Sequence, residues 1–205
     1  MPGLAARASL WNRRRKFELF MRTVQPGPET RVVDVGVGDT GFGTEPGIAV
    51  THNFFEALYP WPERITAVSD VPLPNFAREF PSIRCVTASG TDLPFEDDAF
   101  DVAFSNAVIE HVGGRERQRR LVLEALRVGR RVFLTTPNRR FPVEVHTRLP
   151  FVHWLPDAVA HCAYDLVGKG FAKELDLLSP GTLASLFPGR VRVVNLGLTL
   201  VAIVD

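Results

Sequence analysis

Short apolar runs rich in β-branched residues alternate with amphipathic stretches through the first two thirds of the chain. The apolar runs predict five strands, at residues 32–35, 65–68, 83–87, 100–105 and 132–135. Helical patterns separate most of them, at residues 51–59, 75–80 and 115–128, with Gly129 ending the last helix. Strands that alternate with helices in this way predict a doubly wound parallel sheet.

Both ends of the chain depart from this alternation. Residues 1–25 predict a basic, amphipathic helical lead-in that stops at Pro26-Gly27-Pro28. We interpret its basic run, residues 13–16, as a solvated helix face, with an arm on an anionic surface as the alternative. At the other end, Ser179 caps a helix to residue 187, and residues 191–195 and 198–204 predict an antiparallel hairpin at the sheet edge.

Residues 137–178 interrupt the pattern. The segment is rich in proline, phenylalanine and histidine and is too long for a simple connection, so we interpret it as a lid or substrate-facing insertion. Phe141, Phe151, Trp154 and Phe171 either wall an apolar acceptor pocket or pack the segment onto the sheet.

Composition narrows the class of protein. With 205 residues, 45% of them hydrophobic and 23% charged, the chain has the composition of one soluble globular domain. A formal net charge of +1 gives no electrostatic argument for binding nucleic acid, and Cys85 and Cys162 match neither a disulfide framework nor a zinc motif. We find no signal peptide after the basic run and no window long enough to span a membrane, so we expect a cytoplasmic protein.

The turn after the first strand carries the most informative chemistry. Residues 36–41 (GVGDTG) satisfy G-x-G-x-x-G, which is a weak signal for a dinucleotide site. Asp34 would face a pyrophosphate unfavourably, and Asp70 comes later than the spacing of about 20 residues expected for a ribose-binding acid. A carboxylate at the strand end suits a cationic ligand better, such as S-adenosylmethionine with its sulfonium and ammonium groups.

The order of motifs resembles that of the class I S-adenosylmethionine-dependent methyltransferases, closest to the type 11 branch. VVDVGVGD (residues 32–39) and ITAVSD (65–70) match the first two motifs, LPFEDDAFDVAFSNAVIEHV (93–112) is the most specific match, and TTPN (135–138) fits the loop after the fifth strand. The resemblance implies a Rossmann-like, mostly parallel seven-stranded sheet with an antiparallel C-terminal hairpin. It implies one domain with a lead-in (1–28), a cofactor-binding core (29–136), the inserted segment (137–178) and a closing helix and strands (179–205).

The resemblance also implies S-adenosylmethionine as the cofactor, with Asp70 or the adjacent Ser69 meeting the ribose hydroxyls. The implied cofactor-binding residues are Asp34, Gly36, Val37, Gly38, Asp70, Ser89, Gly90, Thr91 and Asn106. Ser89 stands where the family usually has an aspartate for the adenine amino group, so adenine selection would depend on the backbone at Gly90 and Thr91, or on Asp92 in a shifted loop. Thr40 also replaces a third close glycine.

Methyl transfer requires alignment of nucleophile and methyl group, from which proximity supplies about 7 to 11 kcal/mol. We find no catalytic triad. His111 is predicted to be a general base or to orient the acceptor, with a structural histidine as an equal alternative. Glu144 and His146 alternate, so an extended chain would point both the same way; we favour acceptor contact for His146 and an anchoring hydrogen bond for Glu144. His153 and His161 are predicted to be structural.

Related quinone-pathway methyltransferases hold a metal with acids and a histidine in this region. Here Glu110 and His111 are present, but Ala107 stands where the first acid would fall, so we expect no metal.

The leading hypothesis is methyl transfer from S-adenosylmethionine to a small or lipid-like acceptor, at oxygen, without nucleic acid or an integral membrane segment. The oligomeric state stays open. Two alternatives remain: a nicotinamide-dependent reductase that uses the glycine motif, and a non-catalytic scaffold or partner subunit, which Ser89 motivates.

Overall fold

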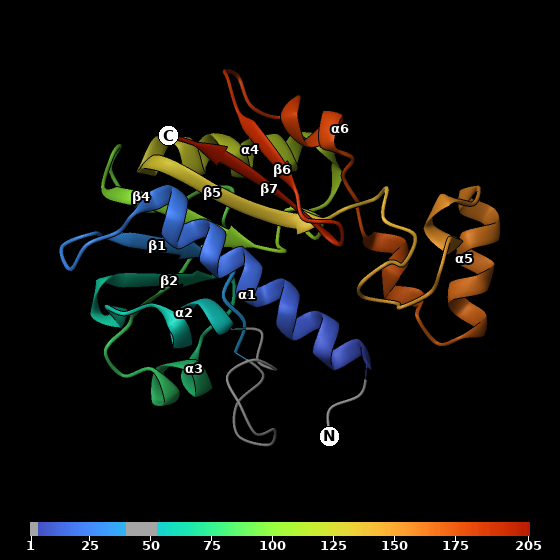
Figure 1. Ribbon diagram of the computed structural model, residues 1–205, viewed down its shortest axis with the longest axis horizontal. Helices are drawn as coiled ribbons and strands as arrows, with labels where there is room; N and C mark the ends of the chain where they lie inside the picture. The colour runs from blue at the N-terminus through green and yellow to red at the C-terminus, as the bar shows by residue number, and fades with distance from the viewer. Residues whose placement is uncertain (1–3, 40–52) are drawn as a thin grey trace.

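A mixed sheet of seven strands organises the part of the chain that the structure describes (Figure 1). The computed structural model describes residues 4–39 and 53–205, with the side chains of residues 4–6 and 8 excepted. The strand order is β3-β2-β1-β4-β5-β7-β6; β1 to β5 run parallel, and β7 pairs antiparallel with both β5 and β6. The strands are β1 (Val32–Val35), β2 (Ile65–Ser69), β3 (Arg84–Thr87), β4 (Phe100–Asn106), β5 (Gly129–Pro137), β6 (Arg192–Asn195) and β7 (Thr199–Val204). This topology confirms the predicted fold class.

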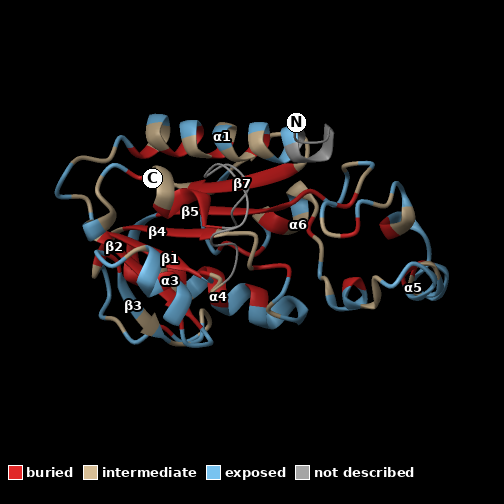
Figure 2. Ribbon diagram, turned by 90° about the horizontal axis from the view of Figure 1, so that it is seen from below, coloured by how far each residue is buried: buried red, intermediate tan, exposed pale blue. Residues whose placement is uncertain are grey.

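Helices cover both faces of the sheet: residues of α1, α2 and α3 pack in one buried cluster, and residues of α4 and α6 pack in the other. Figure 2 shows α1 and α4 on opposite sides of the sheet. The α-helices are α1 (Leu4–Val24), α2 (Phe54–Leu58), α3 (Pro74–Glu79), α4 (Gly114–Val128), α5 (Asp157–Leu166) and α6 (Pro180–Ala184). Alternate residues of β1 serve the two faces: Val33 and Val35 pack in the cluster beneath α4, and Val32 in the cluster beneath α1 and α2. Asp34 shares its face with Val32, and so lies on the α1 and α2 side.

Gly129 ends α4, as predicted, and has a second role in the sheet. Its φ of −116° is extended, and β5 begins at this residue. A Cβ at this position would lie 2.6 Å from the backbone nitrogen of Ala103 on β4. The glycine therefore also permits the close approach of β4 and β5.

The basic run of α1 is only partly solvated, which corrects the sequence interpretation. Lys16 is buried, as are Asn12 and Phe20 at the same spacing of four residues, and only Arg14 of the run is exposed. Residues four apart share one helix face, so this face of α1 packs on the sheet and carries Lys16 inward with it.

The 137–178 segment lies beside the sheet (Figure 1). It contains α5 and the 3-10 helices η3 (Val152–Trp154) and η4 (Gly170–Glu174), and α5 packs against both. Phe151, Trp154 and Phe171 are about half exposed, so these rings do not pack the segment onto the sheet. Among the described residues, no helix is long and apolar enough to cross a membrane.

Candidate functional site

The carboxyl ends of the parallel strands surround a cavity of about 320 Å³. Its walls come from the loops after β1, β2, β3 and β4 and from the first half of α4. In open α/β sheets ligands bind at this edge, where the order of strands reverses. The lining residues are Val35, Gly36, Val37, Ser69, Asp70, Ala88, Ser89, Gly90, Thr91, Ala107, Val108, His111, Val112, Arg117 and Leu121.

Gly36 shapes the turn at the centre of this edge. Its φ is +91°, a conformation that side chains disfavour. A Cβ added to it would lie 2.2 Å from Cγ2 of Val108, in the loop after β4. Both the backbone angle and the close approach therefore require glycine here.

Six of the nine predicted cofactor residues line the cavity, and two more line a small neighbouring one. The six are Gly36, Val37, Asp70, Ser89, Gly90 and Thr91. Asp34 and Asn106 line the neighbour, which shares Gly36 and Val37 with the larger cavity. The ninth, Gly38, accepts a hydrogen bond of 2.9 Å at its carbonyl from Nδ2 of Asn53. Thr40 and Gly41, at the end of the glycine motif, and Thr51, at the start of the predicted 51–59 helix, lie outside the described residues.

Asp39 has a structural role that the motif did not reveal. Its carboxylate accepts hydrogen bonds of 2.8 Å from the backbone nitrogens of Asn75 and Phe76, in the first turn of α3. An acid at a helix N-terminus satisfies backbone donors that otherwise lack a partner. The glycine turn is thereby fixed to α3.

Ser89 and Thr91 form a local polar turn at the cavity wall. Their hydroxyl oxygens are 2.9 Å apart, and the backbone nitrogen of Thr91 donates to Ser89 Oγ at 3.3 Å. Arg117 and Leu121 of α4 face the same cavity, and sequence reasoning missed both. Their spacing of four residues could have shown that they share a helix face.

Asp34 is buried against Glu56 of α2, and the two side chains are hydrogen-bonded. Burial, followed by the charge of Glu56 and the hydrogen bond to it, raises the pKa of Asp34 well above its ordinary value. Burial also raises the pKa of Glu56, to about 7. Two carboxyl groups that interact so closely share a proton. Sequence reasoning identified Asp34 and missed Glu56.

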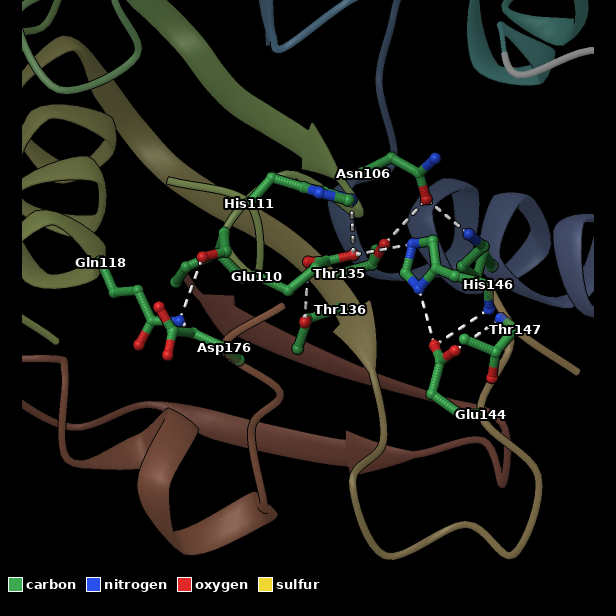
Figure 3. A network of polar contacts seen from close by, with 12 residues as sticks. Asn106, Glu110, His111, Gln118, Thr135, Thr136, Glu144, His146, Thr147 and Asp176 are labelled. Carbon is green, nitrogen blue, oxygen red and sulfur yellow. Dashed lines mark hydrogen bonds and ion pairs between the residues drawn. The ribbon is translucent and has the colours of Figure 1, made fainter. Parts of the chain in front are cut away.

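A second polar cluster gathers where β4 and β5 end (Figure 3). Glu110 and His111 follow β4, and His146 reaches them from the 137–178 segment. Oε1 of Glu110 lies 3.9 Å from His111 Nε2 and 3.8 Å from His146 Nε2. The two imidazole rings stand perpendicular, 5.1 Å between centroids. The structure therefore brings together two predicted catalytic residues with Glu110.

Glu144, the third candidate of the sequence analysis, for which an anchoring hydrogen bond is favoured over acceptor contact, holds His146. Its Oε1 lies 2.7 Å from His146 Nδ1, and its two oxygens accept backbone hydrogen bonds from His146 at 2.9 Å and Thr147 at 2.6 Å. These hydrogen bonds outweigh burial and lower the pKa of Glu144 to about 2, so it is ionised. Although burial opposes it, the hydrogen bond to Glu144 and the charge of Glu110 raise the pKa of His146. The pairing was predicted from an extended chain, but the backbone here forms a turn.

Lys16 adds an amine beside this cluster. Its Nζ donates to Oδ1 of Asn106, which also accepts a 2.8 Å hydrogen bond from Thr135 Oγ1. Burial and the charge of Arg13 lower the pKa of Lys16 to about 7, although Glu110 opposes them. Burial likewise raises the pKa of Glu110 to about 7.

Among the described residues, only one oxygen of the Glu110 carboxylate has a hydrogen-bond partner. Oε2 accepts a bond of 3.0 Å from Thr136 Oγ1, whereas the fully buried Oε1 accepts none. His153 differs from His146: it is buried, and its Nε2 lies 3.0 Å and 3.1 Å from the carbonyl oxygens of Arg139 and Phe141. This arrangement fits the structural role predicted for His153.

Comparison with known proteins finds one family in the sequence. Residues 33–131 match the family model described as "Methyltransferase domain". The match contains the glycine turn, the Ser89 to Thr91 turn and the Glu110-His111 pair, and it ends before Glu144 and His146. No curated protein matches the chain.

Many solved structures share the fold. A possible histamine N-methyltransferase from Thermotoga maritima is 17% identical, with a TM-score of 0.58, 98% of this chain covered and 90% of that one. The 1,6-didemethyltoxoflavin-N1-methyltransferase of Burkholderia thailandensis, solved with 1,6-didemethyltoxoflavin and S-adenosylhomocysteine, is 17% identical, with a TM-score of 0.55. The alignment covers 93% of this chain and 76% of that one. N-methyltransferase NodS of Bradyrhizobium japonicum is 12% identical, with a TM-score of 0.56 and 93% and 85% covered.

Proposed function

We propose that this protein methylates an oxygen of a small acceptor. The chain belongs to the type 11 branch of the class I S-adenosylmethionine-dependent methyltransferases. One observation carries the proposal: the cavity lined by the expected cofactor residues is also lined by His111, a member of the polar cluster. A methyl donor in this cavity would therefore lie beside groups that can accept a proton.

The cofactor residues divide by chemistry along the cavity. We assign the adenine to the turn of Ser89 and Thr91 and the ribose hydroxyls to Asp70, all of which line the larger cavity. Asp34 and Asn106 line the smaller cavity on the other side of Gly36, and we assign them to the amino acid end of the cofactor. An ammonium group there would lie beside the Asp34 and Glu56 pair and favour its ionised form.

We assign the acceptor to the side formed by Glu110, His111 and His146. S-adenosylmethionine bound in the cavity would supply a methyl group that passes from its sulfur to the acceptor oxygen, with S-adenosylhomocysteine as the product. The hydroxyl proton of the acceptor would pass to this cluster. A hydroxyl acceptor needs this help more than an amine does, because it must lose its proton to become a good nucleophile.

Two further features bear on the acceptor. Exposed aromatic side chains of the 137–178 segment, Phe151, Trp154 and Phe171, favour an acceptor with an apolar portion, which includes lipid-like molecules. Several structures of the same fold are named as N-methyltransferases, but at 12% to 17% identity they share the fold alone. Nitrogen is therefore the competing acceptor atom in the test.

The test has two stages. Calorimetric titration with S-adenosylhomocysteine should show one site per chain, and absence of heat at millimolar ligand would contradict the proposal. Methyl transfer from labelled S-adenosylmethionine is then measured to phenols, catechols, long-chain alcohols and the matched amines. We expect the hydroxyl compounds to be methylated; transfer confined to the amines would overturn the assignment to oxygen and leave the cofactor assignment intact.

A further inference from the structure

We propose that Glu110, His111 and His146 form a binding site for a divalent first-row transition-metal ion, for which zinc is the best-matched probe. The proposal goes beyond methyl transfer, because it stands on the arrangement of these three side chains and needs no cofactor. One donor atom from each of the three residues can be chosen so that all of them lie within 4.8 Å of one another. Figure 3 shows the side chains converging.

The separations suit a shared ion better than direct contact. Oε1 of Glu110 lies 3.8 Å from one histidine nitrogen and 3.9 Å from the other, too far for a hydrogen bond. Zinc bonds of about 2.0 to 2.2 Å hold tetrahedral donors roughly 3.3 to 3.6 Å apart. Small side-chain rotations would bring Glu110 to that separation from both histidines.

The carboxylate of Glu110 supplies an independent observation. Its side chain is completely buried, and among the described residues Oε1 has no hydrogen-bond partner. A buried oxygen without a hydrogen-bond partner is destabilising, and more strongly so when it is charged. The amine of Lys16 is close enough to interact electrostatically with this carboxylate, but its Nζ donates its hydrogen bond to Asn106 and not to Oε1. An ion between the histidines would satisfy Oε1 directly.

Supporting groups hold two of the three ligands in the orientation that a metal requires. Oε1 of Glu144 lies 2.7 Å from His146 Nδ1, where it would accept a proton carried by that nitrogen, and Nε2 of the ring faces Glu110. A carboxylate behind a histidine is a common arrangement at metal sites, where it fixes the tautomer and the ring direction. Thr136 holds the second oxygen of Glu110.

The donor set indicates the class of ion. Two imidazoles and one carboxylate suit zinc or iron, whereas magnesium and calcium prefer oxygen ligands alone. Three protein ligands also leave coordination positions open, as in catalytic zinc sites. His111 is about half exposed and lines the large cavity, so an open position there would be within reach of an acceptor. An acceptor hydroxyl that coordinates the ion would lose its proton more readily.

This inference revises the expectation of no metal, which rested on Ala107. That residue adopts a φ of +57° and offers no ligand. The third donor is instead His146, which lies beyond β5 and outside the part of the chain that matches the family model. Residue spacing around Glu110 could not reveal it.

The test uses untagged protein in which both exposed cysteines are replaced (Cys85→Ser and Cys162→Ser), because thiolates also bind zinc. Calorimetric titration with Zn²⁺ at pH 7 should give one ion per chain with a Kd on the order of a micromolar or tighter. Co²⁺ should give visible absorption bands typical of nitrogen and oxygen ligands. His146→Ala and Glu110→Gln should each weaken Zn²⁺ binding by at least about tenfold.

His161→Ala is the matched control, because His161 belongs to no such cluster among the described residues, and its Zn²⁺ affinity should equal that of the parent. Thermal unfolding checks the fold: saturating Zn²⁺ should raise the Tm of the parent and of His161→Ala but not that of Glu110→Gln. Absence of Zn²⁺ and Co²⁺ binding at 100 µM, a preference for Mg²⁺, or unchanged affinity in His146→Ala would each overturn the proposal. Titration with S-adenosylhomocysteine is run separately, so that a failure of cofactor binding is distinguished from a failure of metal binding.

Discussion

The proposed cofactor side and the proposed acceptor side of this site are built in different ways. Strand ends and tight turns of the sheet form the cofactor side, and they rest on two large buried clusters. The 137–178 segment, which supplies Glu144 and His146, has only a small cluster of its own around Ala160, Tyr164 and Ala172. Its exposed apolar side chains are Val145, Phe151, Trp154, Leu155, Val159, Leu166, Val167 and Phe171.

The two sides differ in what fixes the positions of their residues. Backbone conformation positions the cofactor residues, because the sheet fixes where each strand ends. The acceptor residues depend on a few hydrogen bonds that fix the segment to the loop after β4. In one of these the backbone nitrogen of Asp176 donates to the carbonyl oxygen of Glu110 at 2.9 Å. The two sides should therefore respond to different substitutions.

The largest effect is expected for Gly36→Val. The new side chain would meet Val108 and require a positive φ, which together cost roughly 2 to 5 kcal/mol. We expect affinity for S-adenosylhomocysteine, measured by calorimetry, to fall on the order of a thousandfold. Zn²⁺ affinity should fall far less, by no more than about tenfold, although Val108 lies in the loop that carries Glu110 and His111.

Gly27→Ala is the control for that substitution, since a Cβ there meets nothing within 4 Å. It should leave both affinities unchanged. If Gly36→Val bound S-adenosylhomocysteine as tightly as the parent does, the assignment of the cofactor to the Gly36 turn would be wrong.

Sequence reasoning placed residues well where their position follows from the pattern of strands. Asp70 and the Ser89 to Thr91 turn, to which the resemblance assigned cofactor contacts, line the cavity because they lie in the loops after β2 and β3. The same logic gave the five parallel strands. The antiparallel pair β6 and β7 followed from the two short runs separated by Gly197.

Residues that arrive from another element could not be predicted in this way. Lys16 and Glu56 lie on helices, and their burial depends on how α1 and α2 pack on the sheet. The spacing of Asn12, Lys16 and Phe20 contained a signal, because they share one helix face, but the basic run concealed it. Glu144 and His146 were paired correctly for the wrong reason, since a turn and not an extended strand brings them together.

An intermediate effect is expected for Gln118→Leu, which tests the attachment of the segment. Gln118 is fully buried on α4, and its Nε2 donates to the carbonyls of Ile109 at 3.1 Å and Asp176 at 2.9 Å (Figure 3). Leucine leaves both carbonyls without this donor, so the free energy of unfolding should fall by about 1 to 3 kcal/mol. Urea denaturation measures this loss.

The same variant sharpens the comparison through binding. Because Asp176 connects to the loop that carries Glu110, Zn²⁺ affinity should fall by about three- to tenfold, while affinity for S-adenosylhomocysteine stays within twofold. Arg119→Ala, on the exposed face of α4, is the control and should change neither quantity. Equal losses of both affinities would show that the two sides are not separately positioned.

The smallest effect concerns pH and the acid pair of the cofactor side. Burial raises the pKa of Glu56 to about 7 in the folded protein, whereas the unfolded chain has the ordinary value near 4.5. Between these pH values the folded state binds more protons than the unfolded chain does. The stabilising contribution of protonated Glu56 is therefore fully present below about pH 4.5 and is lost as pH rises through 7.

Glu56→Gln mimics the protonated acid and removes this loss. Scanning calorimetry gives the difference in Tm between Glu56→Gln and wild type at each pH. This difference should be larger at pH 8 than at pH 5 by about 2 °C or more. Glu116→Gln replaces an exposed acid on α4 and should follow the wild-type pH profile. Parallel pH profiles of Tm for Glu56→Gln and wild type would contradict this prediction. They would mean that the Asp34 and Glu56 pair makes stability no more dependent on pH than the buried acid of the other side does.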